Sequence, residues 1–423
     1  MPSFRVPHLV AALALCLAGA AQAESEPWVR WLQHRLADLP ASHAIAARVD
    51  AERADSRARA EPRYNPELNI GYQQGEEITR TLGVSQTLDW SGKARAAGDV
   101  SQILDRLADL RGEKARARLT ADAILALVMF DGARARRAAA RQQEARLERL
   151  GDLIRRRERA GDVGQVDATL AWLSLGHAQQ ALARADSHAI AATTVLRQRL
   201  AVAAPGAPLP PPSLWRPAAN ASPEGALQAS HALRLAELQW QLAERGVALS
   251  RKEKHADPTL AVRAGREGEA SLWGLDFSLP LTLFNSGEPE YRAALADQDR
   301  RRALLARTRN DIQARLDGAL EDYHQWRVRW ENWQRLAGAR LGGADDLMER
   351  VWTQGELSTQ NYLQALDRNL QARLAGIALR EAMQRAWVEW LYQSARLQPW
   401  LRRVAAHADY SPAEPGIGQG ATP

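Results

Sequence analysis

The sequence of 423 residues predicts a mainly α-helical protein with a small β part, in which a β-hairpin and a long α-helical hairpin occur twice. The first observation is that residues 67–204 and 290–398 contain no proline, which costs about 3 kcal/mol inside a helix. The second is that stretches of alternating apolar and polar residues stand near the start of each block. The third is that matching features recur at a nearly constant offset, which indicates an internal duplication.

The N-terminus has the features of a secretory signal peptide. Arg5 precedes an apolar run, Leu9–Ala21, and the small-residue site "AQA" ends at Ala23. This run is too short to span a bilayer as a helix. The only cysteine, Cys16, lies inside it, and the preceding Leu15 is not the small residue of a lipoprotein signal. We therefore expect a mature chain from Glu24 onward, without disulfides or cysteine-bound metal.

Charge does not indicate a nucleic-acid partner, although the formal net charge is +6. An exported protein rarely meets nucleic acid, and the arginines alternate with Glu and Asp along the predicted helices. This pattern is typical of a solvated helix face with local ion pairs.

Proline also marks the boundaries of the predicted repeats. Seven prolines lie in Pro205–Pro223, which predicts a helix-free connector. The expected organisation is a signal peptide at 1–23; a first repeat at 24–204, with N-terminal helices, a β-hairpin at about 67–90 and a helical hairpin at about 94–203; the connector at 205–223; a second repeat at 224–403, with a helix at about 224–255, a β-hairpin at about 258–284 and a helical hairpin at about 290–403; and a flexible tail at 404–423.

The second block shows a regular helical pattern of apolar residues, which predicts the seam of a left-handed coiled coil. Spacings of four and three alternate through Ile312, Leu316, Ala319, Tyr323, Trp326, Trp330, Trp333 and Ala337. We interpret the three tryptophans as packing residues rather than as a ligand-binding group. Helices of about 65 residues would be about 100 Å long, which is too long for an ordinary globular domain.

Each long helix is expected to end at a glycine that adopts the left-handed conformation. The two glycines are Gly161 and Gly355, which lie 194 residues apart, while Pro66 and Pro258 lie 192 apart. A shared offset across hairpin, helix and turn supports the duplication.

The expected strands have one apolar face and one small or polar face, as in the wall of a transmembrane β-barrel. Tyr72, Trp90, Trp273 and Phe284 lie near strand ends, where an aromatic girdle would be expected. A half-buried soluble sheet has the same alternation, so the pattern alone leaves both interpretations open.

Geometry limits the membrane interpretation. Four strands are too few to enclose a barrel, for which about eight is the minimum, and free sheet edges are not tolerated in a bilayer. Several copies would therefore have to share one barrel. Three copies would supply twelve strands, and the helical hairpins would continue the wall as an α-helical barrel.

Five segments of the chain resemble the TolC-like outer-membrane factor (outer membrane efflux protein) family. They are "NPELNIGY", "GVSQTLDWSGKARA", "LDFSLPLTLFNSGE", "AGDVGQVDATL" and "QGELSTQNYLQAL". The resemblance covers nearly the whole mature chain, apart from a short N-terminal segment and the tail after about Arg403. The string "SQTLDWSGKA" is similar to the cation-efflux, CzcC-like branch.

The resemblance implies a homotrimer in the outer membrane of a Gram-negative bacterium, surrounded by outer-membrane lipid and with a large periplasmic part. It also implies docking to a periplasmic adaptor protein (membrane fusion protein) and, through it, to an inner-membrane efflux pump. The turns at Gly161–Val163 and Gly355–Leu357 would be the tips where the adaptor docks.

The family also implies a periplasmic gate with acidic residues shortly after the second turn. The matching positions here are Asn361 and Gln364, and the equivalent after the first turn is Asp167. We expect a constriction lined by amides, with any cation preference coming from Asp167 or from the pair Asp345 and Asp346. Alternatively, the amides only solvate an inward face.

No catalytic constellation is recognised, and we expect neither an enzyme nor a bound cofactor. The mature histidines contain no pair at helical spacing, which argues against a dedicated zinc site. The predicted function is passive export, with heavy-metal cations as cargo on the branch resemblance alone; drugs or a secreted polypeptide remain open. The alternative is a soluble periplasmic coiled-coil adaptor, although adaptors carry one helical hairpin and this chain is expected to have two.

Overall fold

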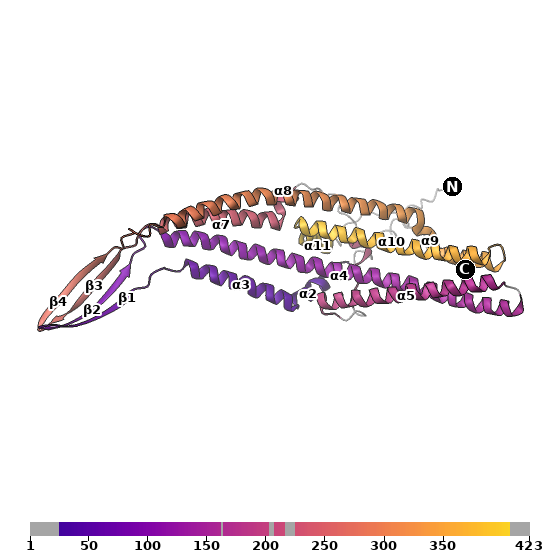
Figure 1. The fold of residues 1–423 in the computed structure, drawn as a ribbon, viewed down its shortest axis with the longest axis horizontal. Coiled ribbons are helices and arrows are strands. Elements are labelled where there is room, and N and C mark those ends of the chain that lie inside the picture. The colour runs from indigo at the N-terminus through magenta and orange to yellow at the C-terminus, as the bar shows by residue number, and fades with distance from the viewer. Residues whose placement is uncertain (1–24, 162–163, 203–206, 216–224, 407–423) are drawn as a thin grey trace, which may run out of the picture. The chain divides into compact units, whose positions relative to one another are not determined.

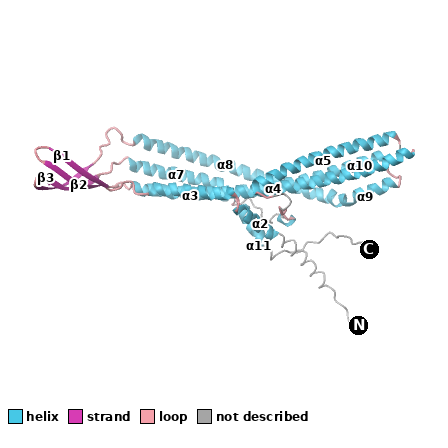
Figure 2. Cartoon of the chain, turned by 90° about the horizontal axis from the view of Figure 1, so that it is seen from below, coloured by secondary structure: helices cyan, strands magenta, loops and turns pink. Residues whose placement is uncertain are grey.

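The computed structural model describes residues 25–161, 164–202, 207–215 and 225–406. The predicted signal peptide, most of the connector and tail, and Val163 lie outside these residues. The described chain is mostly helical and has a four-stranded antiparallel sheet, which confirms the prediction of a mainly α-helical protein with a small β part (Figures 1 and 2). Its elements are α2 (Ser25–Ala37), α3 (Pro40–Ala60), β1 (Glu67–Gln74), β2 (Ile78–Thr87), α4 (Lys93–Ala160), α5 (Gln165–Leu200), η2 (Pro212–Trp215), α6 (Ala226–Ala229), α7 (His231–Glu253), β3 (Thr259–Glu267), β4 (Ala270–Ser278), α8 (Glu288–Trp333), η3 (Gln334–Gly338), α9 (Ala339–Thr353), α10 (Thr359–Gln393) and α11 (Leu397–Ala406).

The residues form two compact units, each of which contains segments of both repeats. One unit comprises Met1–His43, Arg116–Ala226 and Ala314–Pro423; the other comprises Ala44–Ala115 and Leu227–Gln313. We call them the core unit and the sheet unit.

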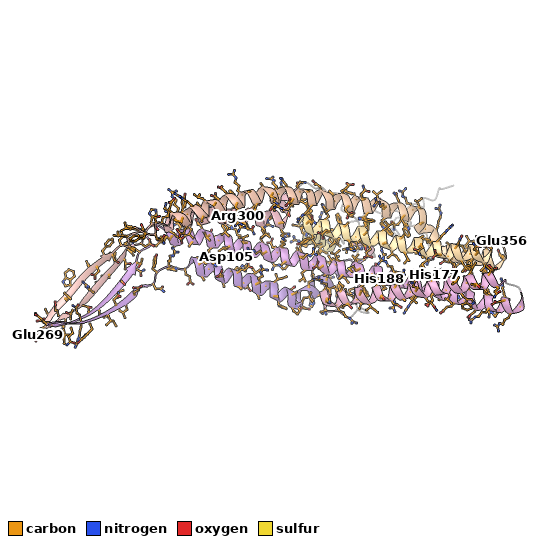
Figure 3. The ribbon with its side chains drawn as sticks, in the orientation of Figure 1. Asp105, His177, His188, Glu269, Arg300 and Glu356 are labelled. Atoms are coloured by element: carbon orange, nitrogen blue, oxygen red, sulfur yellow. The ribbon has the colours of Figure 1, made fainter. Side chains whose placement is uncertain are left out.

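The sheet unit holds all four strands, in the order β1-β2-β3-β4. Both hairpins belong to this one sheet, because β2 pairs with β3 from Thr79↔Glu267 to Thr87↔Thr259. The turn between β3 and β4 has Gly268 at φ 57°, a conformation that suits glycine in a two-residue hairpin turn. Glu269 in this turn is labelled in Figure 3.

Polar contacts help to join the helices of the sheet unit. Ser101 donates its hydroxyl to the carbonyl of Ser56 (2.7 Å), and Ser56 bonds Asp105, which is labelled in Figure 3. Arg53 pairs with Asp109 at 2.6 Å. These contacts connect α3 to the first part of α4.

The core unit has an aromatic and aliphatic interior. Tyr323 packs on Trp387 (ring centroids 4.6 Å apart), and Trp387 stacks on Trp390 (5.2 Å). Burial raises the pKa of Tyr323 to about 12. Three residues of the expected apolar seam are buried: Ile312, Leu316 and Tyr323. Ile312 belongs to the sheet unit, and the other two belong to the core unit.

The helix after β4 differs from the helix after β2 in one respect. Residues Gln334–Gly338 form a π-helical segment between α8 and α9, whereas α4 runs from Lys93 to Ala160 as one α-helix. Among the described residues, no helix has the length and apolar character needed to cross a membrane.

Candidate functional site

Most of one face of the sheet is an apolar surface that is open to solvent in this chain, and Arg80 and Arg266 lie on the same face near the hairpin turns. The register places Val262 opposite Val84 and Leu275, and Leu68 opposite Val84. Ile70 is 79% exposed and Trp273 is 78% exposed. We call this surface the apolar face; its large exposed side chains are Leu68, Ile70, Tyr72, Leu82, Val84, Leu260, Val262, Trp273, Leu275 and Phe277. In a soluble half-buried sheet, helices or a second sheet cover the apolar side chains. Here the described helices leave these side chains exposed.

The opposite face is mostly small or polar. Asn69 donates its side-chain amide to Ser85 Oγ (2.9 Å), and Arg263 pairs with Asp276 at 3.2 Å. Glycines 71, 83, 265 and 274 lie on this face. The sheet is therefore apolar on one side and polar on the other, as a wall between lipid and water requires.

The four aromatic residues of the expected girdle lie at both ends of the strands. Tyr72 and Trp273 lie near the hairpin turns, and Trp90 and Phe284 follow β2 and β4 on the side of the helices. All four are at least 62% exposed. Trp90 also donates its indole N–H to the Ala256 carbonyl (2.8 Å).

The outer edges of the sheet have no described partner strand. Within the described residues, β1 pairs only with β2, and β4 pairs only with β3. The segment after β4 continues the apolar pattern, and Leu281, Leu283 and Phe284 are 75%, 78% and 103% exposed. Free edges and exposed apolar side chains commonly mark a surface that another chain covers.

The junction between strands and helices contains a buried ion pair that the sequence did not reveal. Lys93 Nζ lies 2.7 Å from Asp257 Oδ2, and their side chains are 8% and 3% exposed. Tyr64 donates its hydroxyl to the same oxygen (2.8 Å). Burial, and then the hydrogen bond to Asp257, raise the pKa of Tyr64. One cluster thus joins the residues before β1, after β2 and before β3.

Asp89 fixes the start of α4 beside this ion pair. Its carboxylate accepts the backbone N–H groups of Gly92 (2.9 Å), Lys93 (2.8 Å) and Ala94 (2.6 Å). Burial pushes the Asp89 pKa upward, but these three donors and the charge of Lys93 outweigh it and hold the pKa below its ordinary value. The carboxylate therefore stabilises the helix start, where the positive end of the helix dipole lies.

The glycines that follow α4 and α9 adopt similar φ angles. Gly161 and Gly355 adopt φ values of 84° and 81°, the left-handed conformation that ends a helix at low cost for glycine. Both turns belong to the core unit, where Glu356 is labelled in Figure 3. Leu357 packs on a small apolar core, while Val163 lies outside the described residues. That core comprises Leu147, Leu150, Ile154, Ala168, Ala171, Ala178, Trp352, Tyr362, Leu363 and Leu366.

The expected gate residues lie on α5 and α10. Asn361 and Gln364 are exposed, and Asp167 is half-buried. None of the three side chains makes a hydrogen bond or ion pair with another described residue. Gln364 borders a groove of about 340 Å³ between α5 and α10, together with Leu170 and Asp367. In the single chain, the side chains of Asn361 and Gln364 lie on the surface of α10 and do not form a constriction.

Asp345 does not supply the free carboxylate expected for a cation preference. It is 4% exposed, and its carboxylate pairs with Arg373 (2.8 Å) and Arg146 (3.6 Å) and accepts a hydrogen bond from Asn369. Its charge therefore compensates arginines in the interior. The neighbouring Asp346 keeps an exposed carboxylate, which pairs with Arg146 at 2.9 Å.

Comparison with known proteins identifies the fold. No family model and no curated protein matches the chain. CusC, whose crystal structures concern transmembrane channel formation, aligns with a TM-score of 0.70 and 14% identity over 87% of this chain and 92% of CusC. OprN, an outer-membrane channel, gives 0.71 and 18% over 89% and 91%. VceC, an outer membrane protein of Vibrio cholerae, gives 0.71 and 15% over 89% and 98%. The chain is similar to these proteins along nearly their whole length and shares their fold.

Proposed function

We propose that this chain is one subunit of an outer-membrane export channel of the TolC-like family. The observation that carries the proposal is the apolar face: side chains of all four strands form one surface that the described chain leaves uncovered. In water such a surface promotes association, whereas hydrocarbon solvates it. The strands have eight to ten residues, close to the length that a tilted strand needs to cross a bilayer.

A homotrimer would close the open sheet into a twelve-stranded barrel. The duplication supplies the expected register between copies. Gly92 recurs as Gly287, 195 residues later, and Pro66 recurs as Pro258, 192 residues later. In the observed sheet, Thr87 of β2 lies opposite Thr259 of β3. The residue 195 positions after Thr87 is Thr282, and the residue 192 positions before Thr259 is Glu67. The duplication therefore predicts that Thr282 lies opposite Glu67 of the partner subunit. Residues 279–282 would then lengthen β4 once the partner is present.

The helical hairpins would continue the duct through the periplasm, where a periplasmic adaptor and an inner-membrane pump supply substrate and energy. The adaptor would dock at the turns of Gly161 and Gly355. The chain itself would act passively, with heavy-metal cations as the proposed cargo. Asn361 and Gln364 would line the periplasmic constriction in the trimer, and Asp167 would carry its negative charge.

The adaptor alternative is less well supported. A soluble adaptor would cover its sheet with its own residues, whereas here Ile70, Trp273 and Leu275 are between 74% and 79% exposed. The fold shared with OprN and VceC also favours the channel.

The test is planar-bilayer conductance of the detergent-purified protein, with its mass measured in the same sample. We expect a trimer that gives discrete conductance steps. Monomeric protein that does not conduct and stays soluble without detergent would overturn the proposal.

Replacing Asn361 and Gln364 together by alanine tests the gate separately. Unchanged single-channel conductance and unchanged drug leakage would remove the gate assignment and leave the channel proposal intact.

A further inference from the structure

The core unit contains a cavity of about 950 Å³ to which the proposed function assigns no role. It lies between α2, residues 208–211 and 215 of the connector region, α4, α8, the π-helical segment and α10. All of these residues belong to one unit of one chain. Its volume is within the range of small-molecule sites in proteins. We call it the indole pocket because four tryptophans line it, Trp28, Trp31, Trp215 and Trp330.

Three of the four indole rings are held in place by contacts with neighbouring residues. Trp28 donates its ring N–H to the Pro208 carbonyl (3.2 Å). Trp215 packs on Trp400 with centroids 6.3 Å apart, and Trp330 stacks on Trp333 at 5.3 Å with an 11° angle between the rings. Fixed flat walls favour a flat aromatic occupant, because its stacking requires little reordering of the protein. Trp330 thus has a packing role and also borders the cavity.

The polar residues of the pocket favour an occupant without net charge. Arg380 and Asp131 pair with each other at 2.9 Å, so neither offers an uncompensated charge. Gln384 is 6% exposed, lines the cavity, and makes no hydrogen bond with another described residue. An amide that borders a cavity and has no protein partner can form its hydrogen bonds with a ligand or a water there. A carboxamide satisfies both its donor and its acceptor.

The backbone adds an independent indication. Gln334, the first residue of the π-helical segment, also borders the cavity. Short π-helical segments inside α-helices are frequent at functional sites.

We infer that the indole pocket binds a small, uncharged, planar aromatic molecule that carries a carboxamide or a similar donor–acceptor group. The rings stack on the occupant, and Gln384 exchanges hydrogen bonds with its amide. Every lining residue comes from one unit of one chain.

The test uses the detergent-purified full chain and three probes: indole-3-carboxamide, indole, and cyclohexanecarboxamide, which has the amide but no aromatic face. Binding is followed by saturation-transfer NMR titration. We expect indole-3-carboxamide to bind most tightly. Trp31→Leu should weaken it roughly three- to tenfold through lost stacking. Gln384→Leu should weaken it about five- to tenfold while leaving indole unchanged.

Two matched controls separate the pocket from general effects of indole or glutamine loss. Trp172→Leu removes a partly exposed indole of α5 outside the pocket, and Gln371→Leu removes an exposed amide of α10; neither should change binding. Equal affinity of all variants would assign the signal to the micelle or another surface and overturn the inference. Two other results would also overturn the inference. One is that indole-3-carboxamide does not bind up to its solubility limit, and the other is that cyclohexanecarboxamide binds as tightly as indole-3-carboxamide.

Discussion

The two strand-to-helix junctions have related sequences but different surroundings. "DWSGK" leads from β2 into α4 and "FNSGE" leads from β4 into α8, with Gly92 at φ 79° and Gly287 at φ 67°. After β2, Lys93 forms a buried ion pair. After β4, the equivalent Glu288 pairs with Lys254, and their side chains are 37% and 32% exposed. The turn conformation is therefore the same after both hairpins. The ion pair is buried after the inner strand β2 and partly exposed after the edge strand β4.

The helix starts differ in the same way. At the first junction one carboxylate, Asp89, accepts three backbone N–H groups within 2.9 Å. At the second, Asn285 and Ser286 accept one each, at 3.2 and 3.4 Å. β2 has neighbours on both sides, whereas β4 has one. On the proposed account, the second junction is completed only when another copy pairs with β4.

The largest expected effect comes from removing the buried cation. Lys93→Met leaves the Asp257 carboxylate buried without its partner, and we expect a loss of about 3–5 kcal/mol in the free energy of unfolding. Glu288→Gln at the equivalent position should change stability little, since exposed pairs are screened by solvent. Denaturant unfolding followed by far-UV circular dichroism measures both. Equal effects of the two variants would contradict the distinction between the junctions.

The next effect concerns the helix starts. Asp89→Ala should cost about 1–2 kcal/mol, because it removes a side-chain acceptor for three backbone donors. Asn285→Ala should cost less, because it removes one longer hydrogen bond. The same unfolding measurement checks the order, and a larger loss for Asn285→Ala would reverse the assignment.

The Asp89 contribution should also depend on pH. Its pKa is lower in the folded protein than its ordinary value, so its stabilisation is complete above that ordinary value. It is lost as the pH falls through the folded pKa. The stability difference between wild type and Asp89→Asn should therefore shrink on acidification below about pH 4. A difference that grows instead would show that the carboxylate is not the stabilising form.

The smallest expected effect is on trimer stability. It comes from introducing the ion pair of the first junction at the equivalent positions of the second junction. Lys93 corresponds to Glu288, and Asp257 corresponds to Asn65. The double variant Asn65→Asp with Glu288→Lys should create an ion pair between copies and raise the temperature of trimer dissociation by a few degrees. Each single variant serves as a control. A double variant no more stable than the better single variant would show that these residues do not meet.

The sequence predicted the fold class because its signals are local. Missing prolines, alternation along strands and the glycines at 161 and 355 each act within a few residues. The pairing of β2 with β3 and the ion pair of Lys93 with Asp257 join residues more than 160 positions apart, and no periodic pattern encodes them. One signal was present: an acid or amide precedes proline at both Asn65 and Asp257, beside the hairpins.

Charge patterns were less informative about the site. Asp345 and Asp346 are adjacent in the sequence, yet one is buried among arginines and the other is exposed. Burial follows from which helix face packs on α10, and adjacent residues on a helix point in different directions. The π-helical segment at Gln334–Gly338 was likewise not predicted, because it interrupts a continuous helical pattern.

The central claim is that each chain holds one third of a shared wall, and cysteine cross-linking between strands tests it most directly. The predicted mature chain has no cysteine. Glu67→Cys with Thr282→Cys places thiols on the two free edges. Thr87→Cys with Thr259→Cys is the control, because these residues are partners within one sheet. We predict that oxidation in native outer membranes joins the first pair into covalent dimers and closed trimers, while the control stays monomeric. A first pair that forms only intrachain disulfides, or none while the control pair reacts, would contradict the account.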